Sequence, residues 1–598
     1  MSNGNSSFQK GTWNSLPSNC TQSFTLTYLR CAEYGLVALT ECISWAVTTE
    51  QECVQWAWQT VKKCSWWSWL FCVLFAIITT LVCVAFAIVT IIVCTAVVIV
   101  WQVVCLLWTL VSIIFCLSYA NGGTAFLLTD GTVMMQEFKS FFGATWATRR
   151  WWKLTPDQTG SYQGGKWSRL ADSNLARTYF SSSVLADGRV VVCGGEYSDA
   201  SGTIKNDWNN SCEIYDPIAN TWTAFSAPAN PGAVASLWDE IGDASCTVLP
   251  DGTFLIGSVD SANVAKLDPS SLTWTPMTPR PGVGTSDEDS WVLMPDNTVV
   301  APSCQNPPTT WVYDIANDQW NPGNSLPTSI VDVVDEVGPA LLRYDGTAFF
   351  LGSNEHTAVY SPTPSPNWTN GPDLPDQNGS KIGIVDGPGA LMVNGNVLFG
   401  AGTTDASGDW TSPCWYFEFD GATFNRTNDP PNNDCPTYST RLLLLPNGDI
   451  MFCREGDSSF YAYHSDSAQP QDSFRPVIQA CPATMAPGDT IQISGLQFNG
   501  LSQAVAYGDD SQTPTNYPLV RVVHKQSGHV RYCRTSNHTT MDSNGNVIPS
   551  MGVATGAAVI TTNVEIPGDI DPGDASLYVV ANGIASQPFD VSIWPVIV

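Results

Sequence analysis

Val184-Leu185-Ala186-Asp187-Gly188 is the clearest copy of a phrase that recurs along the chain: an apolar run, then Asp-Gly or a close relative, then a second apolar run. An Asp-Gly pair between apolar runs is a strong β-hairpin signal, because the turn needs residues that tolerate positive φ. Copies follow one another at intervals of about fifty residues, which predicts a repeated unit of four short strands. The seven copies lie at 127–131, 184–188, 248–252, 293–297, 342–346, 392–395 and 444–448.

A second phrase follows within several of these units. It places Tyr-Asp or a relative a few residues before a tryptophan, and it occurs at Tyr215 with Trp222, Leu267 with Trp274, Tyr313 with Trp320, and Tyr360 with Trp368. Both phrases are typical of kelch-type blades. The sequence therefore predicts a seven-bladed kelch-type β-propeller over residues 120–472.

Residues 473–598 have a different pattern and predict a separate immunoglobulin-like β-sandwich. Pro487-Gly488-Asp489 is typical of a turn, and the alternating run 490–495 that follows it is typical of a strand. The apolar run 577–581 has the character of a late strand in such a module.

A kelch propeller followed directly by this kind of module resembles galactose oxidase and the glyoxal oxidases, which are copper radical oxidases. The resemblance covers roughly residues 120–598. It is carried by residues 176–179 leading to 187–190 and Gly194-Gly195, by Tyr438 seven residues before Leu445, and by Tyr507-Gly508. It implies an oxidase whose copper is held by two tyrosines and two histidines, with one tyrosine cross-linked to a cysteine.

The chain departs from the family at its copper ligands. Tyr438 is the only family site residue carried over, because Ser439 and Gln512 stand where the histidines are expected, and Asn121-Gly122-Gly123 stands where the cysteine is expected. A hydroxyl and an amide do not replace two imidazoles as copper ligands. We therefore predict that the oxidase site is absent, that copper is not bound and that no residue is catalytic.

The first fifth of the chain has no counterpart in those oxidases and carries ten regularly spaced cysteines. Eleven residues are three helical turns, so this stride would place the sulfurs in one stripe on a helix. We expect an N-terminal tail at 1–19 and an α-helical region at 20–119, either a hairpin or one long helix. The cysteines are Cys20, Cys31, Cys42, Cys53 and Cys64, then Cys72, Cys83, Cys94, Cys105 and Cys116, with a central step of eight.

The two helical alternatives have different partners. A hairpin turning near Ser68 would form a ladder of disulfides, Cys20–Cys116, Cys31–Cys105, Cys42–Cys94, Cys53–Cys83 and Cys64–Cys72, and its apolar arm would join copies of itself in a homo-oligomer or filament. A long helix with free thiols would favour two membrane spans, because residues 70–117 are almost wholly apolar and need lipid or protein around them.

Composition limits the partners and the compartment. With 54 acidic against 25 basic residues, a net charge of −29 argues against nucleic acid as a partner. Nineteen cysteines favour an oxidising, extracellular or cell-surface setting, although residues 1–5 show no secretory signal pattern. Among the cysteines outside the repeat, three candidate pairs are Cys246 with Cys304, Cys414 with Cys435, and Cys453 with Cys481.

Acidic groups recur just upstream of the predicted blade turns, where each enters the innermost strand of its blade. The recurrence predicts carboxylates around one mouth of the central channel. Hard oxygen ligands suit calcium, and the same groups can hydrogen-bond a glycan; a solvated acidic rim without a ligand is the third alternative. The residues are Asp239, Glu240 and Asp243, then Asp287, Glu288 and Asp289, then Asp335 and Glu336, then Asp386.

These observations predict a non-enzymatic surface or assembly protein that displays the propeller as a head. Two alternatives stay open: a divergent copper radical oxidase acting on alcohols or aldehydes of sugars, and a membrane-anchored carbohydrate-binding protein.

Overall fold

The computed structural model describes residues 11–17, 73–74, 77, 120–141, 144–229, 237–282, 284–333, 335–403, 411–466, 468–508 and 511–594. The chain divides into two units, Met1–Pro17 with Ala120–Val598, and Ser18–Tyr119. The described elements are β-strands, apart from two short 3₁₀ helices, η2 (Thr437–Ser439) and η3 (Asp472–Phe474).

The expected α-helical region at 20–119 is a wrong prediction, because the described elements are β-strands and two 3₁₀ helices and include no α-helix. The prediction depended on an apolar face that a partner must bury. An apolar stripe without a packing partner does little to stabilise a helix in water. The ten cysteines of the proposed ladder lie outside the described residues. No helix in the described part of the chain has the length and apolarity needed to cross a bilayer.

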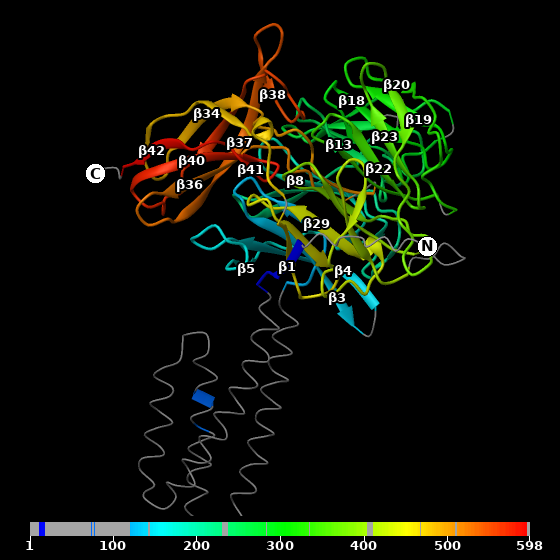
Figure 1. The fold of residues 1–598 in the computed structure, drawn as a ribbon, viewed down its shortest axis with the longest axis horizontal. Coiled ribbons are helices and arrows are strands. Elements are labelled where there is room, and N and C mark those ends of the chain that lie inside the picture. Colours follow the sequence, from blue (N-terminus) through cyan, green and yellow to red (C-terminus); the bar gives the residue numbers. More distant parts are fainter. Residues whose placement is uncertain are drawn as a thin grey trace, which may run out of the picture. The chain divides into compact units, whose positions relative to one another are not determined.

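Seven antiparallel sheets of the described residues form the blades of a propeller (Figure 1). Blade 1 contains β2 (Ala125–Leu127), β3 (Val133–Phe141), β4 (Ala144–Thr155) and β5 (Lys166–Arg169). Blade 2 contains β7 (Ser181–Val184), β8 (Val190–Cys193), β11 (Cys212–Asp216) and β12 (Thr221–Phe225). Blade 3 contains β13 (Cys246–Val248), β14 (Phe254–Ile256), β15 (Ala265–Asp268) and β16 (Thr273–Pro276). A small sheet of β6 (Arg177–Thr178), β9 (Tyr197–Ser198) and β10 (Lys205–Asn206) accompanies blade 2.

The remaining four blades repeat the same plan. Blade 4 contains β17 (Val292–Leu293), β18 (Thr298–Pro302), β19 (Thr310–Asp314) and β20 (Gln319–Pro322); blade 5 contains β21 (Val337–Leu342), β22 (Ala348–Gly352), β23 (Thr357–Ser361) and β24 (Asn367–Asn370); blade 6 contains β25 (Pro388–Leu391), β26 (Val397–Ala401), β27 (Trp415–Phe419) and β28 (Phe424–Arg426); blade 7 contains β29 (Thr440–Leu444), β30 (Ile450–Arg454), β31 (Tyr461–Ser465) and β1 (Gly11–Ser15).

The predicted hairpin turns are confirmed in all seven blades, where each joins the first two strands. In blade 2, Leu185 N donates to Arg189 O at 2.9 Å and Gly188 N donates to Leu185 O at 2.8 Å. Gly188 has a φ of +87°, which explains why glycine or asparagine recurs there. The same pair of hydrogen bonds recurs at Leu128, Leu249, Met294, Arg343, Met392 and Leu445.

The second phrase places an aromatic pair on the outer two strands of a blade. The ring centroids of Tyr215 and Trp222 lie 5.2 Å apart in blade 2. The equivalent pairs, Tyr313 with Trp320 and Tyr360 with Trp368, lie 5.0 Å and 5.1 Å apart. These tilted ring contacts, together with the apolar surface that the rings bury, stabilise the pairing of the two outer strands.

Strand β1 closes the ring of blades, although residues 1–19 had been expected to form a tail. It pairs with β31 from Gly11 opposite Ser465 to Ser15 opposite Tyr461, so the N-terminal strand completes the last blade (Figure 1). Leu16, directly after β1, is buried at 3% exposure.

The chain leaves the propeller and returns to it at the same place. Leu16 N donates to Phe460 O, and Gly122 N donates to Asp457 O, both at 2.8 Å. The described residues on either side of 18–119 therefore both bind one loop, 457–460.

The C-terminal strands form one continuous arrangement in which the long β37 pairs with β36 at one end and with β39 at the other. Its apolar core includes Ile493, Val520, Cys533, Val564 and Leu577. The immunoglobulin-like class of this module stays a prediction. The strands are β32 (Val477–Ala480), β33 (Thr484–Met485), β34 (Thr490–Leu496), β36 (Leu519–His524), β37 (Val530–Met541), β38 (Val547–Pro549), β39 (Ile560–Glu565), β40 (Gly573–Ala581), β41 (Ile584–Ala585) and β42 (Phe589–Ile593).

An axial segment, residues 503–508 and 511–517, joins this module to the propeller. Its strand β35 (Val505–Tyr507) pairs with β25 and becomes the fifth strand of blade 6. Ser182 Oγ of blade 2 donates to Gln512 O at 3.1 Å, and Ser290 Oγ, just before blade 4, donates to Gly508 O at 2.5 Å. The segment therefore contacts several blades along their innermost strands.

Buried His538 in β37 predicts acid sensitivity of the C-terminal module. Its side chain is inaccessible, its Nδ1 lies 2.9 Å from Thr562 Oγ1, and burial lowers its pKa from 6.5 to about 3. Between pH 6.5 and about pH 3, the imidazole of His538 is protonated in the unfolded chain but not in the folded chain. The stability that the neutral imidazole contributes is therefore fully present above pH 6.5 and is lost as the pH falls toward 3. At pH 4.5 the loss is about 2 to 3 kcal/mol.

Urea unfolding of the wild type and of His538→Phe at pH 7 and pH 4.5 measures this loss. Between pH 7 and pH 4.5, the free energy of unfolding of the wild type should fall by about 2 to 3 kcal/mol more than that of His538→Phe. A difference that is the same at both pH values would contradict the prediction.

Candidate functional site at the acidic mouth of the propeller

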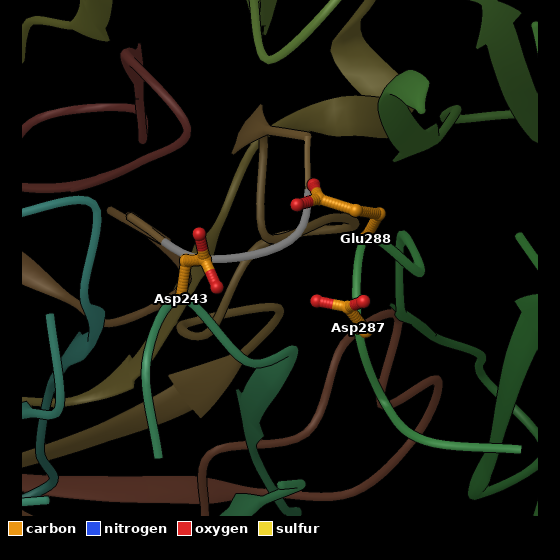
Figure 2. A group of neighbouring side chains, drawn as sticks. All are labelled: Asp243, Asp287 and Glu288. Carbon is orange, nitrogen blue, oxygen red and sulfur yellow. The ribbon is translucent and has the colours of Figure 1, made fainter. Parts of the chain in front are cut away.

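Loops that lead into the innermost strands of blades 3 to 6 bring five carboxylates together, which we call the acidic mouth: Asp243, Asp287, Glu288, Glu336 and Asp386. One oxygen from each of Asp243, Asp287 and Glu288 lies within 4.8 Å of the others. Figure 2 shows these three carboxylates turned toward a common space from two loops. Glu288, Glu336 and Asp386 form a second group of the same size. Because Glu288 belongs to both groups, the five residues make one cluster.

The loops of the acidic mouth share an uncommon backbone geometry. Glu288, Asp335 and Asp386 precede the innermost strands of three successive blades, and their φ angles are +58°, +65° and +38°. Residues other than glycine rarely adopt this left-handed conformation, which carries a cost of roughly 1–3 kcal/mol each. The surrounding propeller therefore holds these loops in a defined shape.

Gly508 of the axial segment passes close to this cluster. A Cβ at this position would lie 2.6 Å from Asp386 Oδ1, and its φ is +44°. Only glycine lets the axial segment pass at this distance. This explains the glycine in the Tyr507-Gly508 motif.

The structure brings together five of the nine acidic residues proposed from the sequence, and it places the other four elsewhere. Asp289 is fully buried, forms an ion pair with Arg280 and accepts a hydrogen bond from Cys304 N at 2.9 Å. Asp239 and Asp335 are exposed, and Glu240 is half-buried; none of the three belongs to either group of converging oxygens.

Burial and mutual repulsion shape the electrostatics of the acidic mouth. Burial raises the pKa of Asp287 to about 6 and of Asp386 to about 7, and nearby carboxylates add to both effects. The pKa of Glu336 is raised well above its usual range by burial and then by Asp386. The buried oxygens Glu336 Oε2 and Asp386 Oδ1 accept no hydrogen bond from any described residue. The repulsion among carboxylates held this close together disfavours their charged forms unless a positive charge or a hydrogen-bond donor offsets it.

A cavity of about 390 Å³ adjoins the acidic mouth and combines acidic with aromatic side chains. Glu336 and Asp386 line it, together with Glu196 and Glu455. The aromatic lining comes from Trp146, Tyr179, Tyr197 and Tyr438. A neighbouring cavity of about 580 Å³ shares Tyr179, Tyr438 and Glu455 with it.

Sequence reasoning missed Glu196, Tyr197, Arg441 and Glu455. None of them recurs at a fixed position in successive blades, so the pattern that revealed the acidic loops could not reveal them.

Arg441 places a buried positive charge beside Tyr438, the position carried over from the oxidase resemblance. Its guanidinium lies 2.8 Å from Glu455 Oε1, donates to Tyr438 O at 2.6 Å and lies 4.0 Å from the ring centroid of Tyr507. Tyr507 OH donates to Tyr438 O at 2.5 Å. The space around Tyr438 is therefore organised by an arginine ion pair and cation–π contacts.

Comparison with known proteins identifies a kelch repeat in blade 2. Residues 177–227 match the kelch motif, which confirms the predicted repeat type there. An F-box/kelch-repeat protein of Arabidopsis thaliana is 39% identical over 61 residues, which are 10% of this chain and 16% of that protein. The chain thus spans about a sixth of that relative's length.

Two solved structures show a distant likeness. A fungal alcohol oxidase of the AA5 family, in complex with copper, is 14% identical, with a TM-score of 0.44 over 79% of this chain and 98% of that one. A catalytically inactive virginiamycin B lyase from Staphylococcus aureus, with quinupristin, is 12% identical, with a TM-score of 0.37 over 56% and 97%. Nothing about activity follows from values this low.

Proposed function

We propose that this protein is a non-enzymatic surface or assembly protein whose propeller is a binding head, and that its acidic mouth binds a divalent cation, calcium above others. The observation that carries the proposal is the convergence of carboxylate oxygens from four blades in two groups that share Glu288. The shielded, unpartnered oxygens Glu336 Oε2 and Asp386 Oδ1 support it independently.

The donor set favours calcium over other common ions. Calcium takes six to eight oxygen ligands in flexible geometry, whereas magnesium demands a near-ideal octahedron and zinc prefers nitrogen and sulfur. The two groups of the acidic mouth consist of carboxylates, and these come from separate loops. A bound cation would also favour the charged forms of Asp287 and Asp386, whose pKa is raised first by burial and then by nearby carboxylates.

The adjoining cavity supports a hydroxyl-rich ligand such as a glycan. Carboxylates accept hydrogen bonds from hydroxyl groups, and aromatic faces such as those of Trp146 and Tyr197 offer apolar surface to a sugar ring. Ligand hydroxyls could complete the coordination of a cation held by Glu336 and Asp386, which also line the cavity.

The arrangement around Tyr438 speaks against the copper oxidase alternative. Ser439 Oγ donates to Pro436 O at 2.9 Å, and Gln512 Nε2 lies 3.4 Å from the carbonyl oxygens of Tyr507 and Gly508. Neither group supplies an imidazole ligand, and the guanidinium of Arg441 opposes a second cation beside Tyr438. These residues do not fit a copper site.

The oligomer, filament, membrane and cell-surface expectations stay predictions. They concern residues 20–119 and the cysteine usage of the chain, and nearly all of those residues lie outside the described part of the structure.

Calorimetric titration of the full chain with calcium at neutral pH tests the proposal. We expect binding with a Kd of about 10⁻⁶ to 10⁻⁴ M, and affinity at least roughly tenfold lower in Glu288→Gln, because both groups lose a shared charge. Asp239→Asn, at an exposed carboxylate outside both groups, is the matched control and should bind like the wild type.

Two results would overturn the proposal. One is the absence of calcium binding in the wild type, and the other is equal binding by Glu288→Gln and the wild type. Stoichiometric copper together with peroxide release from an alcohol substrate would favour the oxidase alternative instead.

A further inference from the structure

Two buried thiols meet beside the larger cavity. Cys414 directly precedes β27, and Cys435 lies in the connection from β28 to η2. The two residues are 0% and 1% exposed. Cys414 Sγ donates to Cys435 O at 2.9 Å, so the two residues are in direct contact. The structure thus juxtaposes one of the cysteine pairs suggested by the sequence, with both thiols free.

The two sulfurs have different surroundings. Cys435 lines the cavity of about 580 Å³, together with Ser439 and Arg454, whereas Cys414 does not line it. Contact with the Cys414 thiol, and then with Ser439 and Arg454, lowers the pKa of Cys435 against the effect of burial. The same contact, together with burial, raises the pKa of Cys414 well above its usual range. Cys435 is therefore the better nucleophile of the pair.

Other buried thiols of the described residues provide a contrast. Burial raises the pKa of Cys453 and of Cys533 to about 12. Cys453 Sγ donates to the backbone oxygen of Gly123. Such thiols react poorly with oxidants, because the thiolate is the reactive form.

We propose that Cys414 and Cys435 form a two-cysteine redox site, in which Cys435 reacts with a small hydroperoxide that enters the cavity and Cys414 resolves the product as a disulfide. With hydrogen peroxide, the Cys435 thiolate attacks one oxygen, the O–O bond breaks, and hydroxide leaves as Cys435 becomes a sulfenic acid. The Cys414 sulfur then attacks the Cys435 sulfur, and the S–O bond breaks. The proton of Cys414 joins the departing hydroxide as water. The proton that the Cys435 thiol released joins the first hydroxide as a second water. Two thiols are thus oxidised, and one peroxide is reduced to two waters.

The disulfide would tie blade 6 to the segment that leads into blade 7. Residues 415–434 between the two cysteines include β27 and β28, the outer strands of blade 6. Cys435 lies three residues before Tyr438, which borders both cavities. Oxidation at this site would thus fix one wall of the cavities covalently. The inference does not depend on cation binding.

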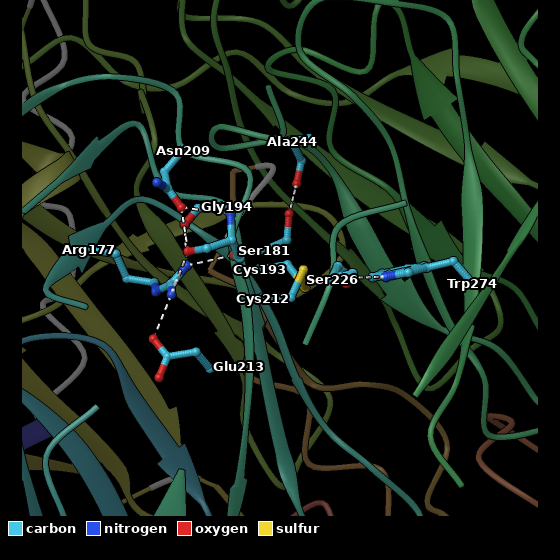
Figure 3. The surroundings of a disulfide bond; sticks show 11 residues. Arg177, Ser181, Cys193, Gly194, Asn209, Cys212, Glu213, Ser226, Ala244 and Trp274 are labelled. Atoms are coloured by element: carbon cyan, nitrogen blue, oxygen red, sulfur yellow. Dashed lines mark hydrogen bonds and ion pairs between the residues drawn. A yellow bond between two sulfur atoms is a disulfide. The ribbon is translucent and has the colours of Figure 1, made fainter. Parts of the chain in front are cut away.

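Peptide mapping of the full chain after peroxide treatment tests the proposal. The protein is first reduced with a dithiol, then treated with about one equivalent of hydrogen peroxide, and finally alkylated in denaturant. We expect the Cys414–Cys435 peptide to become the main new cross-link. The Cys193–Cys212 disulfide of blade 2 (Figure 3), mapped in a sample taken before the reduction, provides an internal standard for detecting buried disulfides.

Serine variants assign the two roles. In Cys414→Ser, dimedone should label Cys435 as a sulfenic acid; in Cys435→Ser, neither the cross-link nor a label on Cys414 should form. Cys453→Ser is the matched control and should still form the cross-link. The proposal is overturned if peroxide leaves both thiols alkylable, if Cys453 or Cys481 is oxidised as fast as Cys435, or if the dimedone label falls on Cys414.

Discussion

Removal of residues 1–17 is expected to destabilise the propeller strongly, whereas replacement of residues 18–119 by a flexible Gly/Ser linker is not. The first change removes β1, whose five residues pair with β31. It also removes Leu16, which is buried in the core. Trp13 is lost as well, together with the hydrogen bond that its Nε1 donates to Asn428 O at 2.7 Å. Loss of large packed side chains costs about 3–5 kcal/mol, a large fraction of the stability of a typical domain.

The linker variant should retain stability within about 1 kcal/mol, because loop length has a weak effect on closure entropy. Leu16 and Gly122 are both held by the loop 457–460, so a short connection can join the two ends of the insertion. Urea unfolding measures both effects, with Leu16→Ala as an intermediate case. If the linker variant lost more stability than the chain without residues 1–17, the closure of blade 7 by β1 would be refuted.

Glu213→Ala is expected to lower the free energy of unfolding by about 3–5 kcal/mol, because it leaves a buried guanidinium without its counter-charge. Arg177 Nη2 and Glu213 Oε1 lie 2.7 Å apart, and both side chains are 1% exposed (Figure 3). Glu213 also accepts hydrogen bonds from the backbone and side-chain nitrogens of Asn174, each at 2.7 Å. One substitution therefore disrupts a network inside the kelch repeat.

Two further variants sharpen this prediction. Asp472→Ala breaks the ion pair with Arg475, in which the aspartate is 90% exposed, and should cost less than about 1 kcal/mol. Joint replacement by Arg177→Met and Glu213→Leu should recover part of the loss, since no buried charge remains. An effect of Glu213→Ala no larger than that of Asp472→Ala would contradict the account.

The blades could be predicted from the sequence because their signals are local. Each Asp-Gly turn forms its hydrogen bonds within five residues, as at Leu185 to Arg189, and the pattern recurs in every blade. Strand β1 could not be predicted in this way, because Gly11 pairs with Ser465 at the other end of the propeller. Five residues without a repeated pattern do not specify so distant a partner.

The helical prediction at 20–119 was wrong because it depended on periodicity alone. A regular stride of cysteines shows which residues would share a helix face, but it does not supply the packing that a helix needs. None of the described elements is an α-helix.

The acidic mouth could be predicted in part, because its loops occupy equivalent positions in neighbouring blades. Neighbours in one loop still differ: Glu288 joins the cluster, while Asp289 turns into the core against Arg280. Sequence adjacency alone could not separate them. Arg441 and Glu455 come from blade 7 alone, so no repeat revealed their ion pair.

A crystal structure of the protein grown with calcium shows whether the acidic mouth is a cation site. We predict an ion bound by Glu288 together with Glu336 and Asp386, or with Asp243 and Asp287, at calcium–oxygen distances of about 2.3–2.6 Å. Electron density without an ion among these carboxylates, or with a metal held instead beside Tyr438, would contradict it.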